Sequence, residues 1–200
     1  MKYALLLLLF STSSLWASVV GVSTHPLNDD ARVFSAEMTG YMSQRHEMGA
    51  GIRYTQEVEQ DRLLDLSASG GQESRGLTLG GGMDFEMLSE DVNQPRVSFK
   101  PYMQYQKFDE TTSTYMGAAP TIRKGFSING QEVFPYLAVP TGMKLDSETD
   151  EFVYYASVTL GASMPFPGAN NERVLLSVEG NKNMGSTSDY VGCLVSWMWK

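Results

Sequence analysis

The last eleven residues, 190–200, alternate strictly between two kinds of side chain, and this alternation constrains the fold more than any other feature. Side chains that alternate with a period of two belong to a β-strand. A closed membrane barrel can finish on such a strand, because its last strand pairs with its first and its outer face meets lipid. We therefore expect one uniformly apolar face to contact lipid: Val191, Cys193, Val195, Trp197 and Trp199.

Segments with the same alternation recur along the chain, separated by turn-rich patches. They cover residues 31–42, 47–58, 62–69, 77–88, 96–108, 114–124, 133–143, 152–164, 173–181 and 190–200. This pattern predicts an all-β fold, a closed antiparallel up-and-down transmembrane β-barrel of about ten strands. Bacterial barrels have even strand numbers, so eight strands is the alternative if residues 62–69 belong to a long loop. The Asn129-Gly130 pair predicts a two-residue hairpin turn.

The start of the chain has the features of a secretory signal. Lys2 supplies the positive charge, residues 4–10 form an apolar run, and residues 11–17 are mostly small and polar. The apolar run is too short to cross a bilayer as a helix. We expect a signal peptide at 1–17, cleaved after Ala17, a lead-in segment at 18–30, and an outer-membrane β-barrel at 31–200.

Composition excludes several classes of protein. The formal net charge of -8 argues against nucleic-acid binding, which needs a basic face. Cys193 is the single cysteine, so an intrachain disulfide cannot form. The mean hydropathy of -0.22 suits a soluble protein and equally a membrane barrel, in which lumen residues dilute the lipid-facing ones.

The second face of the strands carries charges of both signs among glycines and serines. In a small barrel these side chains would point into the lumen, pair with one another and close it to bulk flow. In a soluble periplasmic β-sandwich or lipocalin-like binding barrel, the same face would be the solvated surface, and this reading remains an alternative. The predicted lumen charge network consists of Glu37, Arg53, Glu57, Asp65, Asp84, Glu86, Lys100, Arg123, Arg173 and Glu179.

A signal peptide, alternating strands and an aromatic closing strand together resemble the small bacterial outer-membrane β-barrel superfamily, of the outer-membrane protein A transmembrane-domain type. The resemblance implies outer-membrane lipid and lipopolysaccharide as surroundings, and the barrel-assembly machinery as a partner during insertion. Members typically end on Phe or Trp, whereas Lys200 follows Trp199 here. No cofactor is implied.

Catalytic signals are weak. The only histidines are His25, before the first strand, and His46, in a predicted turn, and no Gly-x-Ser-x-Gly occurs. We predict neither catalytic nor metal-binding residues. Three functions remain: a structural or surface-interaction barrel with a closed lumen, a narrow channel for small solutes or ions, and a rim enzyme acting on lipid through His46. For the closing strand, we expect a charge at Val195 to be costly and the same change at Ser196 to be tolerated far better.

Overall fold

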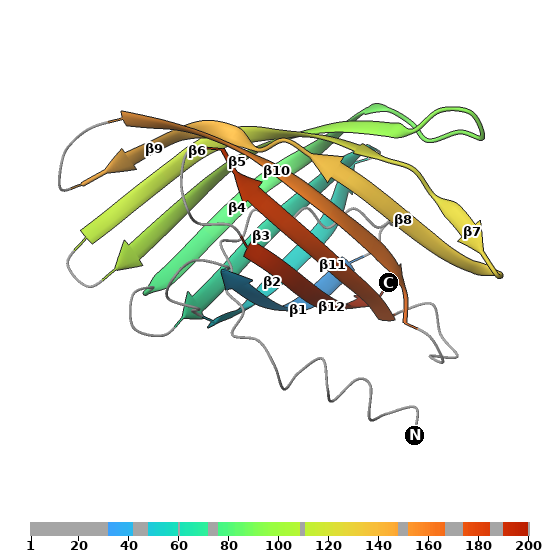
Figure 1. Cartoon of the computed structure of the whole chain (residues 1–200), viewed down its shortest axis with the longest axis horizontal. Helices are drawn as coiled ribbons and strands as arrows, with labels where there is room; N and C mark the ends of the chain where they lie inside the picture. Colours follow the sequence, from blue (N-terminus) through green and yellow to red (C-terminus); the bar gives the residue numbers. More distant parts are fainter. Residues whose placement is uncertain are drawn as a thin grey trace, which may run out of the picture.

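The computed structural model describes residues 32–41, 48–59, 61–71, 76–108, 111–147, 152–166, 174–184 and 190–199 (Figure 1). No helix in these ranges is long and apolar enough to cross a membrane. The proposed signal peptide, the lead-in segment and both histidines lie outside them. The strands are β1 (Arg32–Tyr41), β2 (Met48–Glu59), β3 (Arg62–Gly71), β4 (Leu77–Leu88), β5 (Arg96–Phe108), β6 (Thr111–Arg123), β7 (Phe126–Ile128), β8 (Gln131–Ala138), β9 (Thr141–Asp146), β10 (Phe152–Pro165), β11 (Val174–Asn183) and β12 (Tyr190–Trp199).

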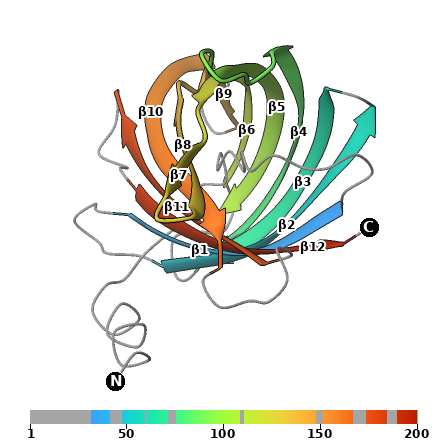
Figure 2. The ribbon, with the colours of Figure 1, turned by 90° about the vertical axis from the view of Figure 1, so that its right-hand side faces the viewer.

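These segments form one closed antiparallel barrel with ten strand positions, in the order β1-β12-β11-β10-β8-β6-β5-β4-β3-β2. β8 and β9 share the position between β6 and β10, and β7 pairs only with β8. β1 pairs with β12 over its whole length and also lies beside β2, so the sheet closes on itself (Figure 2). The prediction of about ten strands is confirmed.

Two alternatives for the fold are wrong. β3 is a full strand that pairs with β2 on one side and β4 on the other, so residues 62–69 are not a loop and the barrel does not have eight strands. The two-layer sandwich is excluded because a single sheet closes into a barrel.

Proline and glycine set the local irregularities. The strand predicted at 133–143 divides at Val139 and Pro140, because Pro140 has no N–H to give to the ladder. The Pro140 carbonyl still accepts the Ser157 N–H at 2.9 Å, which keeps β10 beside the break. Asn129 and Gly130 have φ angles of 53° and 78°, as a type I′ turn requires, and they join β7 to β8. The predicted hairpin is confirmed.

The barrel has a polar interior and an apolar exterior. Inward positions are nearly inaccessible: Ser35, Thr159 and Ser163 are each 0% exposed. Many outward positions are large, apolar and open to the surroundings. They include Ile52, Leu66, Met103, Leu160 and Trp197, which are between 47% and 61% exposed. A soluble barrel normally has the opposite arrangement, with its large apolar side chains inside.

Candidate functional site

A chain of buried ion pairs crosses the interior from β1 to β5. The guanidinium of Arg53, on β2, contacts the Glu37 carboxylate of β1, and its Nη1 lies 3.3 Å from Asp65 Oδ2 of β3. The ammonium of Lys100, on β5, contacts the same Asp65 oxygen. Arg53 is 1% exposed and Glu37 is 3% exposed. Two cations and two carboxylates therefore neutralise one another inside the barrel.

Alternation along each strand brings these four side chains together, and one glycine makes the reach of Lys100 possible. β4 lies between β3 and β5, so Lys100 must cross it to meet Asp65. A Cβ built on Gly82 of β4 would lie 3.0 Å from Lys100 Cε and 2.7 Å from the Pro101 carbonyl oxygen. The missing side chain at Gly82 leaves the path open.

Tyrosines fill the interior next to the ion pairs. The hydroxyls of Tyr102 and Tyr155 contact each other, although their strands, β5 and β10, are not neighbours. The ring of Tyr115 packs edge-on against Tyr155, with 5.6 Å between the centroids. The cavity beside Lys100 and Tyr102 has a volume of about 20 Å³, which is room for about one water molecule.

A further pair lies on the β8 to β11 side. The Tyr136 hydroxyl donates a hydrogen bond to Glu179 Oε2 at 2.6 Å. Tyr136 is 4% exposed and Glu179 is 2% exposed, so this bond supplies a buried carboxylate with a partner. It also links two strands that β10 separates.

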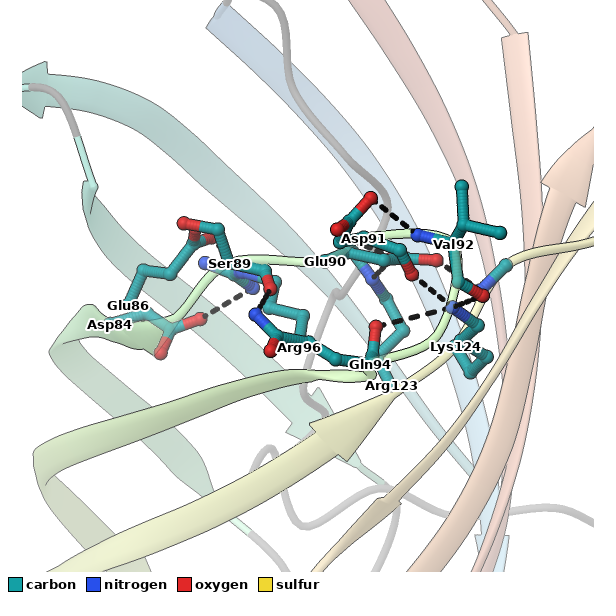
Figure 3. A network of polar contacts seen from close by, with 11 residues as sticks. Asp84, Glu86, Ser89, Glu90, Asp91, Val92, Gln94, Arg96, Arg123 and Lys124 are labelled. Atoms are coloured by element: carbon teal, nitrogen blue, oxygen red, sulfur yellow. Dashed lines mark hydrogen bonds and ion pairs between the residues drawn. The ribbon is translucent and has the colours of Figure 1, made fainter.

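A second cluster lies at the barrel end where β4 turns into β5, and Figure 3 shows it. Arg96 contacts Glu86, and its Nη1 lies 3.5 Å from Asp84 Oδ2. Arg123 Nη2 lies 3.0 Å from Glu90 Oε2.

The turn between β4 and β5 is held by backbone groups as well. The other oxygen of Glu90 accepts the Gly125 N–H at 2.6 Å. Lys124 Nζ donates to three carbonyls of the turn, those of Asp91, Val92 and Gln94, the last two at 3.0 and 3.1 Å (Figure 3). The turn is thereby fastened to the end of β6.

Most residues of the predicted lumen network lie on the inward face. Glu37, Arg53, Asp65, Asp84, Arg123 and Glu179 are buried, and Glu57, Glu86 and Lys100 are partly buried. Arg173 lies outside the described residues. Whether the set acts as a functional site stays a prediction.

Sequence reasoning missed several interior residues. Arg96 has the same parity as Lys100 on β5, so the alternation could have identified it. Glu90 lies in a turn, where no periodicity points inward. Tyr102 has the same parity as Lys100, but its contact with Tyr155 could not be foreseen, because this contact depends on how the barrel closes.

The closing strand presents two different faces. Val195 is 45% exposed and Trp197 is 60% exposed, whereas Leu194 and Ser196, which alternate with them, are 2% and 1% exposed. Val191 and Cys193 have the same parity as Val195, and the side chain of Trp199 lies outside the described part. Ser196 is buried, and its hydroxyl lies 2.8 Å from that of Ser35. The expectation that a charge is tolerated far better at Ser196 than at Val195 stays a prediction.

In the described ranges no group of histidine, cysteine, aspartate and glutamate is arranged to hold a metal ion. No family model and no curated protein matches the chain. Solved structures do resemble it. An outer-membrane channel from Pseudomonas putida F1 matches with 9% identity and a TM-score of 0.52, over 91% of this chain and 100% of that one.

Two further solved structures match with lower scores. LpxR from Salmonella typhimurium has 11% identity and a TM-score of 0.43, over 86% of this chain and 85% of that one. A de novo designed transmembrane β-barrel has 8% identity and a TM-score of 0.42, over 88% of this chain and 100% of that one. At such low identity the likeness to the Pseudomonas channel concerns the fold alone. The chain thus folds as an antiparallel β-barrel of the kind that outer-membrane proteins form.

Proposed function

We propose that this protein is an integral outer-membrane β-barrel with a side-chain-filled lumen, and that it has a structural or surface-interaction role without enzymatic activity. The observation that carries the proposal is the chain of ion pairs from Glu37 through Arg53 and Asp65 to Lys100 across the interior.

The outer surface supports membrane insertion. Transmembrane strands need about 9 to 11 residues, and β1 and β12, which close the barrel, have 10 residues each. Leu160, in the middle of β10, is 61% exposed, and large apolar side chains are exposed on nearly every strand. In water such a surface would favour aggregation, whereas in a bilayer it replaces lipid–lipid contacts. A lipocalin-like binding barrel would hold these side chains inside.

The contacts in the interior favour a closed lumen rather than a narrow channel. Ions pass through a wide polar lumen when the inward charges face water. Here Arg53 and Lys100 face carboxylates, and Tyr102 meets Tyr155 from a strand that is not its neighbour. Breaking such a buried pair leaves each charge without its partner, which costs several kcal/mol for each uncompensated charge. The pairs therefore stabilise the closed arrangement.

The surroundings of the barrel follow from this proposal. Its apolar face would contact outer-membrane lipid and lipopolysaccharide, and the barrel-assembly machinery would insert the chain through its closing strand, β12. The segment at 1–17 would direct secretion across the inner membrane.

Conductance in planar bilayers tests the closed lumen. The wild-type barrel, purified from the outer-membrane fraction and shifted in gel mobility by boiling, is expected to give no steady single-channel steps. A variant with Arg53, Lys100 and Tyr102 all changed to alanine removes much of the interior bulk and serves as the matched control that conducts. Steady steps from the wild type would refute the closed lumen. A lipid acyl-hydrolase activity that disappears in His46→Ala would refute the non-enzymatic role.

A further inference from the structure

The N-terminal end of β10 extends beyond the end of its neighbour β11. Pairing between β10 and β11 stops at Ser157↔Asn183, and one more backbone bond joins the Met184 N–H to the Ala156 carbonyl at 2.9 Å. On its other side β10 stays paired with β9 as far as Phe152↔Leu145. In Figure 1 this end of β9 and β10 reaches beyond β11 at the left. Among the described residues, 152–155 thus have a strand on one side only.

The hydrogen-bonding groups on the open side can be assigned. In an antiparallel strand the N–H and C=O of one residue point to the same side, and successive residues alternate. The Ala156 carbonyl faces β11, and the Ser157 N–H faces the opposite side, toward Pro140. By this alternation Phe152 and Tyr154 present their N–H and C=O groups to the open edge. Val153 and Tyr155 use theirs toward β9.

Within the described part of the chain, this edge is apolar and has none of the usual protection. Phe152 is 58% exposed, Val153 is 52% exposed and Tyr154 is 81% exposed. Native edge strands are commonly protected by lysine, proline, a bulge or a covering segment. The run from Phe152 to Tyr155 contains no charge and no proline, and its register with β9 is continuous. An edge left in this state is able to pair with another strand.

We propose that the N-terminal end of β10 is a binding site for an extended polypeptide segment, which adds a strand beside Phe152 and Tyr154. The occupant is a peptide because only an extended backbone offers donors and acceptors at the spacing of the two free pairs. On one face its side chains would be apolar, since they would lie beside Phe152 and Tyr154. The site does not depend on the closed lumen.

Hydrogen exchange on the purified barrel tests the geometry and the binding together. Without a ligand, the Tyr154 amide is expected to exchange about tenfold faster than the Tyr155 amide, because only the latter is bonded within the sheet. The probe is a synthetic eight-residue peptide of alternating valine and threonine. It is expected to slow exchange at Phe152 and Tyr154, and an N-methylated version of the same peptide is expected to have no effect.

Two proline variants separate binding from folding. Tyr154→Pro removes a donor that the sheet does not use, so this barrel is expected to fold and keep its heat-modifiable mobility, while the peptide no longer slows exchange at Phe152. Tyr155→Pro removes a donor that faces β9 and is expected to weaken the β9–β10 pairing itself.

Several results would overturn the proposal. Equal exchange rates at Tyr154 and Tyr155 in the free barrel would mean that the edge is already covered. A peptide without effect on the wild type would mean that no strand is added. Protection that rises with barrel concentration alone, or with lipopolysaccharide alone, would assign the edge to a second copy or to lipid. None of these results bears on the conductance measurement, so the two proposals fail separately.

Discussion

Removing the Arg53 guanidinium is the most informative single change to the interior. Arg53 is 1% exposed and contacts both Glu37 and Asp65. In Arg53→Met, Asp65 keeps Lys100, but Glu37 loses the cation beside it. Removing one partner of a buried ion pair costs about 3–5 kcal/mol, because the remaining charge is left uncompensated. We expect the free energy of unfolding to fall by that amount.

The assay is reversible unfolding in guanidinium from lipid vesicles, followed by tryptophan fluorescence. The matched control is Arg62→Met, because Arg62 is an exposed arginine whose Nη1 lies 2.6 Å from Glu59 Oε2. Such a surface pair contributes about 0–1 kcal/mol. Adding Glu37→Gln to Arg53→Met should restore part of the loss, since the uncompensated charge is then gone. Equal effects of the two arginine variants, or no recovery in the double variant, would refute the reasoning.

Three further changes probe the outer face and the other polar contacts. Val195→Arg places a charge near the middle of β12 on its exposed face and should lower the free energy of unfolding in vesicles by about 2–4 kcal/mol; a loss below 1 kcal/mol would argue against lipid contact there. Tyr136→Phe removes the donor to the buried Glu179 and should cost about 1–3 kcal/mol in the same assay, and an unchanged midpoint would contradict this role. Lys124→Met removes the ammonium from three carbonyls and should speed hydrogen exchange at the Gln94 amide, which bonds to the Asp91 carbonyl; unchanged exchange would mean that the turn holds without it.

Much of the barrel could be predicted because the side-chain period of a strand is two. Once one residue of a strand is assigned inward, every second residue follows, so Glu37, Arg53 and Asp65 were placed on one side from sequence alone. The even strand number of bacterial barrels then allowed ten strands or eight, and the structure has ten positions.

The remaining features depend on contacts that alternation does not encode. The ion pair of Lys100 with Asp65 requires a path across Gly82, and the meeting of Tyr102 with Tyr155 requires the curvature of the closed sheet. Glu90 lies in a turn, where the alternation of a strand predicts no direction for its side chain. The contact between the Ser196 and Ser35 hydroxyls depends on the register between β12 and β1.

The open edge at Phe152 and Tyr154 could not be predicted from the sequence either. The segment 152–164 was predicted as a strand, but its pattern does not reveal where the neighbouring strand stops. That information comes from the register between β10 and β11, which ends at Ser157.

The most direct test of a lipid-facing exterior and a closed interior is labelling of two adjacent positions on β10. In a Cys193→Ala background, Leu160→Cys replaces a side chain that is 61% exposed, and Thr159→Cys replaces one that is 0% exposed. In intact outer membranes, a fluorophore at position 160 should be quenched by nitroxide lipids, and position 159 should react with a water-soluble maleimide only after denaturation. Rapid maleimide reaction at position 159 in the folded barrel, or no lipid quenching at position 160, would contradict the account.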